Sequence, residues 1–338
     1  MAGNVVRSRV LSARQVDDED RFGRAGRGSR PRSRLRPQHT DAVNGRVVTV
    51  DRGRYGCLLD DDTPIVAMRA RELGRRSVVV GDEVSVVGDV GGGTDALARI
   101  VRVKDRRSVL RRTADDDDPI ERVIVANAEQ LVVVCSIADP PPQPRLVDRC
   151  LVAAFDAGIE PLLVVTKVDL GPPDALLEIY RDVGLQVITS ARDARTVALA
   201  ALHERLHDRV TVFVGTSGVG KSTLVNALVP DADQRIGVVS LTTGKGLHTT
   251  TAAIALPLPD GGWVVDTPGV RSFGLAHVDR DRLVSCFPDL VGGTAACPTD
   301  CDHVDQEVCE LDAWVAAGHA HRERLDSLRR LLVSRTAD

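Results

Sequence analysis

The spacing of apolar residues along the chain changes near residue 107. Before it, short apolar or alternating runs are separated by glycine- and aspartate-rich turns, and the runs lie at residues 46–50, 56–59, 65–69, 77–80, 83–87 and 98–103. Alternation with a period of two residues is typical of half-buried strands. Five or six short strands in about 60 residues predict a small N-terminal β-barrel, and an OB-fold is the form we favour.

Beyond residue 120 the pattern becomes one of apolar strands that alternate with helices. Strands are expected at residues 131–137, 161–165, 185–189, 211–214 and 262–265, and helices at residues 144–155, 173–183, 196–207 and 224–228. This alternation predicts a doubly wound, mostly parallel α/β sheet. Ligands bind at the carboxyl ends of the strands in such a sheet, so the residues that follow each strand are the functional candidates.

The strand at residues 211–214 is followed by a loop that matches the phosphate-binding pattern G-x-x-x-x-G-K-[ST]. Its glycines let backbone amides point at an anion, and the next helix adds its positive N-terminal end. Lys221 then reaches the β- and γ-phosphates of a nucleotide, and the Ser222 hydroxyl coordinates magnesium. The predicted nucleotide-binding residues of this loop are Gly215, Thr216, Ser217, Gly218, Val219, Gly220, Lys221, Ser222 and Thr223.

Two other strand ends indicate that the nucleotide carries guanine. The strand at residues 161–165 runs into Thr166-Lys167-Val168-Asp169, which matches the N-K-x-D motif of GTPases with Thr in place of Asn. The aspartate carboxylate accepts two hydrogen bonds from guanine that adenine does not offer, while the lysine stem covers the base. The next strand ends in Ser190-Ala191, where a backbone amide meets the guanine oxygen.

The strand at residues 262–265 ends in Asp266-Thr267-Pro268-Gly269. This is the D-x-x-G pattern, in which the aspartate holds the magnesium shell and the glycine amide contacts the γ-phosphate. Before that strand, the glycine- and threonine-rich segment 242–251 occupies the place of a first switch. Of its threonines we choose Thr250 as the magnesium ligand beside Ser222 and Asp266.

The order of these motifs differs from that of an ordinary small GTPase. Such a protein runs phosphate loop, first switch, D-x-x-G, N-K-x-D and then S-A, whereas here T-K-x-D and S-A precede the phosphate loop. The order predicts a circularly permuted GTPase domain. Its second switch leads directly into the segment after residue 270, so we expect the nucleotide state to act on the C-terminal part.

The C-terminal part contains a Cys/His group with metal-ligand spacing, formed by Cys297, Cys301, His303 and Cys309. Three thiolates and one imidazole fit a closed, tetrahedral, structural zinc site. The alternative is a set of buried cysteines without metal. Residues 311–333 then predict one or two helices with a leucine stripe, and we expect the arginines beside the stripe to face solvent: Arg322, Arg324, Arg329 and Arg330.

Charge divides the chain into a basic front and an acidic remainder. Residues 1–113 hold 24 Lys+Arg against 15 Asp+Glu, although the whole chain has a net charge of -4. Residues 1–40, with ten arginines among Gly, Ser and Pro, predict a disordered arm that meets a polyanion. Only Tyr55 offers the barrel an aromatic ring for stacking, so we favour RNA-backbone contact, with a structural spacer as the alternative.

The expected class is a soluble cytoplasmic protein. No run of about 18 apolar residues indicates a membrane span, and the arginine-rich N-terminus lacks the apolar core of a signal peptide. Seven cysteines, three of them grouped with a histidine, fit metal binding better than a disulfide framework.

Taken together, these motifs resemble the circularly permuted GTPases that act on the small ribosomal subunit during its maturation, the RsgA type. The resemblance covers residues 41 to about 330. It implies an arm (1–40), an OB-fold RNA-binding barrel (41–113), the GTPase domain (114–275) and a zinc-binding helical domain (276–338). The chain departs from the family at Thr166, at Leu247, where arginine is common, and in the three-residue spacing between Cys297 and Cys301, which leaves Cys286 as an alternative ligand.

The resemblance implies a monomeric GTP hydrolase that binds the small subunit and its rRNA and is stimulated by it, with GTP, Mg²⁺ and one structural Zn²⁺. Lys221 stabilises phosphoryl charge. Val270 stands where many GTPases carry a water-orienting glutamine, and His248 is the candidate replacement. The alternatives are an RNA-binding assembly factor that uses GTP as an occupancy switch, and a permuted GTPase of the large subunit.

Overall fold

The computed structural model describes residues 39–73, 77–91, 97–113, 120–230, 253–268, 273–305 and 307–334. The predicted barrel lies in the first three of these ranges. Backbone contacts separate residues 1–38 from residues 39–338, and every described residue belongs to the second unit. The predicted arginine-rich arm therefore lies outside the described residues, except for its last two positions. No helix in the described ranges combines the length and the apolar character needed to cross a membrane.

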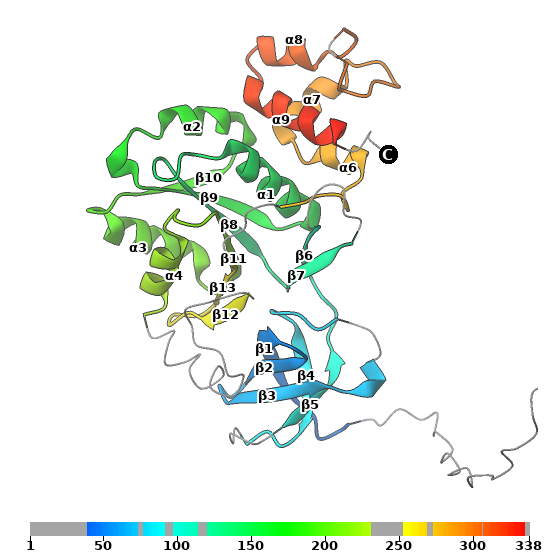
Figure 1. The fold of residues 1–338 in the computed structure, drawn as a ribbon, viewed down its shortest axis with the longest axis vertical. Coiled ribbons are helices and arrows are strands. Elements are labelled where there is room, and N and C mark those ends of the chain that lie inside the picture. Colours follow the sequence, from blue (N-terminus) through cyan, green and yellow to red (C-terminus); the bar gives the residue numbers. More distant parts are fainter. Residues whose placement is uncertain are drawn as a thin grey trace, which may run out of the picture. The chain divides into compact units, whose positions relative to one another are not determined.

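Five strands close the predicted barrel: β1 (Val43–Asp51), β2 (Arg54–Leu59), β3 (Pro64–Arg69), β4 (Glu83–Gly88) and β5 (Ala98–Val103) (Figure 1). Their order is β1-β2-β3-β5-β4, and β4 pairs back onto β1, so these strands form a closed ring. Alternate residues point inward and form an apolar core with Val47, Cys57 and Ile100 fully buried. The fold class predicted for this part is confirmed.

One expected strand is absent from the barrel. The apolar run at residues 77–80 contributes only an isolated bridge, between Val80 and Val125. The reason is a local turn: a carboxylate oxygen of Asp82 accepts the Val79 amide at 2.8 Å, and Arg106 contacts both carboxylate oxygens of Asp82. These bonds replace the strand pairing that the apolar pattern suggested.

The GTPase sheet has the order β10-β9-β8-β11-β13-β12, in which β12 alone is antiparallel to its neighbour. Its strands are β8 (Gln130–Ser136), β9 (Glu160–Thr166), β10 (Gln186–Ser190), β11 (Val210–Val214), β12 (Ile254–Pro257) and β13 (Trp263–Asp266). The parallel, doubly wound architecture is therefore as predicted. The carboxyl ends of β8, β9, β10, β11 and β13 meet at one edge.

Helices cover both faces of this sheet (Figure 1). Along β8, Leu131 and Val133 pack with α1 (Pro144–Ala157) and α2 (Asp174–Ile179), whereas Val132 and Val134 pack with α3 (Arg195–Leu206) and α4 (Lys221–Leu228). Helix α1 begins with a proline and ends at a left-handed glycine, which is the expected distribution of these residues at helix ends.

The barrel and the GTPase sheet share backbone pairing. Thr49 of β1 pairs with Ile254 of β12. After the barrel, β6 (Val109–Arg112) pairs with β7 (Arg122–Ala126). The close approach continues at Gly81, where a Cβ atom would lie 2.1 Å from the Ala126 carbonyl oxygen, so only glycine fits there.

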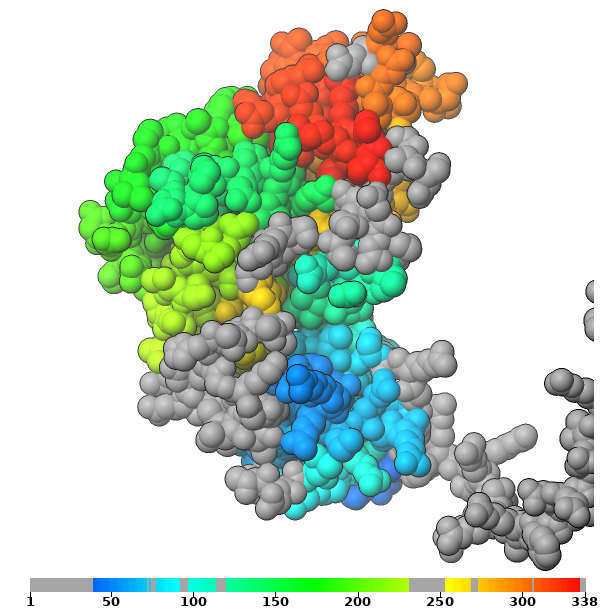
Figure 2. All heavy atoms as spheres, viewed as in Figure 1, coloured from blue at the N-terminus to red at the C-terminus, as the bar shows by residue number. Residues whose placement is uncertain are grey.

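The C-terminal part contains α6 (Arg280–Ser285), α7 (Pro288–Thr294), α8 (Leu311–Ala316) and α9 (Arg322–Val333). These helices, orange to red in Figure 2, lie against the green helices of the GTPase domain. The leucine stripe of α9 is buried in the same apolar cluster as α1. The expectation of solvent-facing arginines is wrong for Arg324 and Arg329, which are 0% and 7% exposed because carboxylates on neighbouring helices pair with them.

Candidate functional site

The phosphate loop joins β11 to α4 and has the backbone geometry that its glycines predict. Gly218 and Gly220 have φ angles of 85° and 92°, which is the left-handed region that side chains with a Cβ avoid. At Gly215 a Cβ atom would lie 2.7 Å from the carbonyl oxygen of Val134, so the loop packs directly on β8. Glycine is thus required at Gly218 and Gly220 by the backbone conformation, and at Gly215 by the close approach of β8.

The lysine of this loop faces the D-x-x-G strand. Lys221 begins α4, is 7% exposed and forms an ion pair with Asp266 at the end of β13. The Thr267 hydroxyl donates to the Phe213 carbonyl at 2.7 Å, which fixes the end of β13 against β11. The structure therefore brings together Lys221, which we expect at the phosphates, and Asp266, which we expect in the magnesium shell.

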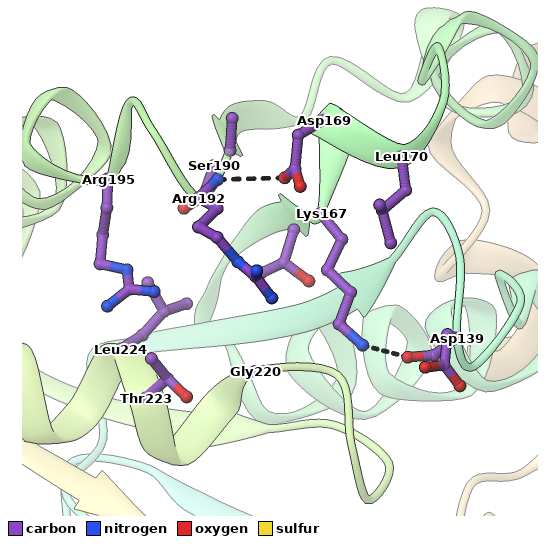
Figure 3. Close-up of a pocket in the computed structure, with 12 residues that line it drawn as sticks. Asp139, Lys167, Asp169, Leu170, Ser190, Arg192, Arg195, Gly220, Thr223 and Leu224 are labelled. Carbon is purple, nitrogen blue, oxygen red and sulfur yellow. Dashed lines mark hydrogen bonds between the residues drawn. The ribbon is translucent and has the colours of Figure 1, made fainter.

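The guanine-reading residues lie at the ends of β9 and β10. Lys167 adopts a left-handed conformation (φ 58°), and its ammonium group contacts the Asp139 carbonyl beyond β8. A carboxylate oxygen of Asp169 accepts the Arg192 amide at 3.0 Å (Figure 3). This bond holds the Asp169 carboxylate beside Ser190 and Ala191, and these three residues line the pocket that is described below.

Thr166 lines the pocket and also contacts the phosphate loop. It is 5% exposed, and its hydroxyl donates to the Val219 carbonyl at 2.6 Å. The bond joins the base-reading segment to the phosphate loop across 53 sequence positions. Thr166, which stands where the GTPase motif has Asn, thus forms a direct bond between two parts of the site.

These segments enclose a pocket of about 240 Å³, and several of its lining residues fall outside the motifs. Asp139 follows β8, and Arg192 and Arg195 extend from the β10–α3 side toward α4 (Figure 3). The only signal for them is position: Asp139 follows a parallel strand, Arg192 comes directly after Ala191, and Arg195 begins a helix. Such positions are common, so the motifs alone did not single them out.

Part of the predicted site lies outside the described residues. The first switch at residues 242–251, with His248 and Thr250, belongs there, as do Gly269 and Val270. Ser222, by contrast, is described and exposed next to Lys221 in the first turn of α4. Its hydroxyl and the Asp266 carboxylate are oxygen ligands of the kind that magnesium prefers.

The Cys/His group comes together as predicted. One ligand atom from each of Cys297, Cys301, His303 and Cys309 lies within 4.8 Å of the others. Cys286, the alternative ligand, is buried in the apolar cluster and does not belong to this group. Three sulfurs and one nitrogen fit tetrahedral zinc. Burial raises the pKa of the Cys297 thiol to about 11, so metal binding must displace a tightly held proton.

Comparison with known proteins places this arrangement in a family. The model of the RsgA GTPase family matches residues 103–276, from the last barrel strand to just beyond D-x-x-G. The chain belongs to the RsgA GTPase family. It is therefore a GTP-hydrolysing enzyme, and guanine nucleotide with Mg²⁺ is what the family binds.

Two relatives carry the name small ribosomal subunit biogenesis GTPase RsgA. The protein of Chlorobaculum parvum is 40% identical over 270 residues, which cover 77% of this chain and 86% of the relative. The protein of Pseudomonas aeruginosa is 40% identical over 268 residues, which cover 76% of each chain.

Two solved structures have a similar fold. YjeQ from Thermotoga maritima matches with a TM-score of 0.67 and 25% identity over 88% of this chain and 99% of that one. YloQ, described as a circularly permuted GTPase, matches with a TM-score of 0.65 and 24% identity over 89% and 98% of the two chains. The second likeness concerns the fold alone, and its permuted order is the one that the motifs predicted.

Proposed function

We propose that this enzyme hydrolyses GTP on the small ribosomal subunit during late maturation, and that the subunit stimulates the reaction. The observation that carries the proposal is the 40% identity to relatives named for small-subunit biogenesis, combined with the assembled nucleotide pocket. A soluble, cytoplasmic monomer suits this role.

Base selection and phosphate binding are assigned to opposite sides of the pocket. Asp169 accepts the guanine nitrogens and Lys167 covers the ring, while the phosphate-loop amides and Lys221 hold the phosphates. Magnesium, when bound, neutralises charge on the β- and γ-phosphates. Ser222, Asp266 and Thr250 are its proposed ligands. Lys221 and Asp266 pair with each other in this structure. Lys221 would hold phosphate, and Asp266 would hold magnesium, in the nucleotide-bound enzyme.

Water activation is assigned to His248, because Val270 has no group that orients a water. In this proposal the imidazole aligns the attacking water on the subunit-bound enzyme. We expect slow hydrolysis by the free enzyme and faster hydrolysis on the subunit.

RNA contact is assigned to the arm and to one end of the barrel. The β1–β2 turn, the end of β3 and the start of β5 meet there, as the pairings of Met68 with Arg54 and with Arg99 indicate. Exposed arginines gather at this end: Arg52, Arg54, Arg69, Arg71 and Arg99. Guanidinium groups bind phosphate without reading base sequence, so the shape of the RNA selects the binding site.

The proposed zinc ion would have four protein ligands, which is typical of a structural site.

The test is phosphate release from GTP and from ATP, measured alone, with small subunits and with large subunits, at two salt concentrations. We expect stimulation with GTP and small subunits only. His248→Ala should keep GTP affinity and lose the stimulation, whereas His207→Ala, an exposed histidine on the GTPase domain, should keep both. Salt-sensitive subunit binding without stimulation would instead identify an RNA-binding occupancy switch.

A further inference from the structure

Arg329 of α9 lies against the Cys/His group although it is not a ligand. Its side chain is buried. Its Nε donates to the His303 carbonyl at 3.1 Å, and its two terminal nitrogens contact the two carboxylate oxygens of Asp312, in the first turn of α8. One guanidinium therefore joins α9, the ligand loop and α8.

Arg329 contacts the backbone of one ligand, His303, and the side chain of Asp312, which is close in sequence to another ligand, Cys309. His303 has a left-handed backbone (φ 59°), so its carbonyl direction depends on what holds it. Asp312 lies three residues after Cys309, whose sulfur is 3.9 Å from the Nδ1 of His303. Holding both segments restricts the separation of these two ligand atoms.

Charge gives Arg329 a second role. Three thiolates outweigh the charge of one divalent zinc ion, so the metal–ligand group is negative in a half-buried place. A guanidinium group stays protonated in proteins. The bonds of Arg329 to the His303 carbonyl and to Asp312 therefore hold a permanent cation against the ligand loop.

We propose that Arg329 is a positioning residue of the metal site, which orients the His303 and Cys309 ligands and offsets the negative charge of the metal–thiolate group. The proposal rests on the zinc site assigned above. Loss of Arg329 leaves Asp312 with a remaining cation, because Arg322 also pairs with that carboxylate. A weaker metal site in the variant would therefore not be explained by an unpaired Asp312 carboxylate.

The experiment uses the zinc-loaded full chain with Arg329→Gln and Arg329→Lys, and Arg330→Gln as the exposed control on the same helix. Zinc content is measured by elemental analysis, and zinc release by transfer to a chromophoric chelator. Outer-shell partners of metal ligands contribute about 10- to 100-fold to affinity, so Arg329→Gln should release zinc on that scale faster than the control. Arg329→Lys, which keeps charge but not the bridging geometry, should fall between them.

Cobalt substitution separates positioning from general loss of stability. The thiolate-to-cobalt absorption band should shift in Arg329→Gln and not in Arg330→Gln. Release and absorption equal to those of the control would overturn the inference while leaving the zinc site intact, whereas an intact chain that binds no zinc would refute the site itself. If Arg329→Gln does not fold, the same comparisons with Arg329→Lys decide the matter.

Discussion

The buried cation Arg324 holds the C-terminal helices on the GTPase domain, and its replacement should be costly. It is fully buried, makes two 3.0 Å bonds to the carboxylate of Asp289 on α7, and makes a 2.6 Å bond to Asp148 on α1. Its guanidinium carbon also lies 4.4 Å from the centre of the Phe287 ring. Removing one member of a buried ionic group costs about 3–5 kcal/mol, because the remaining charges lose their partner.

We therefore expect Arg324→Met to lower the free energy of unfolding of the C-terminal part by about 3–5 kcal/mol. This is a large fraction of the total free energy of unfolding of a domain, which is about 5–15 kcal/mol. The assay is denaturant unfolding followed by Trp314 fluorescence in a Trp263→Phe background. Trp314 is a suitable reporter because its indole nitrogen donates to the Asp289 carbonyl at 2.9 Å. Arg330→Met is the matched control on the exposed side of α9.

The pH dependence of this loss has a definite sign. Burial already raises the pKa of Asp148 in the intact chain, and Arg324 opposes that rise. Without Arg324 the folded-state pKa rises further above its unfolded value, so proton binding stabilises the folded variant at low pH and this contribution is lost as pH rises. The deficit relative to the parent should shrink from pH 8 to pH 6. A deficit no larger than that of Arg330→Met, or one that grows toward pH 6, would refute the reasoning.

Three further predictions concern the nucleotide and RNA sites. Asp169→Asn should lower GTP affinity about 10- to 100-fold in fluorescent-nucleotide titrations, because one charged hydrogen bond contributes about 1.5–3 kcal/mol, and unchanged affinity would count against guanine reading. Thr166→Val should lower the free energy of unfolding, measured by denaturant titration, by about 1–3 kcal/mol because it leaves a buried carbonyl without a donor, whereas Thr166→Ser should not. Arg52→Gln with Arg99→Gln should weaken small-subunit binding and reduce its salt dependence by about two counterions, and an equal effect of Arg181→Gln would contradict the assignment.

Short-range chemistry explains what could be predicted from sequence. The phosphate loop and T-K-x-D are contiguous, so residue types and spacing identify them without knowledge of distant contacts. Parallel strands place their carboxyl ends together, which is why Lys221 and Asp266 could be assigned to one site. The Cys/His group is likewise contiguous, and its four ligand atoms come together in the structure.

Long-range pairing explains what sequence did not reveal. Arg324 flanks a leucine stripe, and its partner Asp148 lies 176 positions away, so no local pattern distinguishes it from an exposed arginine. The Thr166 bond to Val219 depends on how two loops meet. The apolar run before Gly81 was expected to be a strand, because the side-chain bonds of Asp82 are invisible to periodicity.

The pairing of Thr49 with Ile254 has a consequence for dividing the protein into pieces. A boundary after the barrel follows composition, yet it cuts a continuous sheet and an apolar cluster that includes Val48 of β1 and Val265 of β13. A GTPase domain produced without its barrel would present β12 as an exposed edge strand, the kind of edge that recruits other chains into aggregates. The barrel thus covers an edge strand of the GTPase sheet, in addition to its proposed role in RNA binding, and the enzyme should be handled as one piece from residue 39 onward.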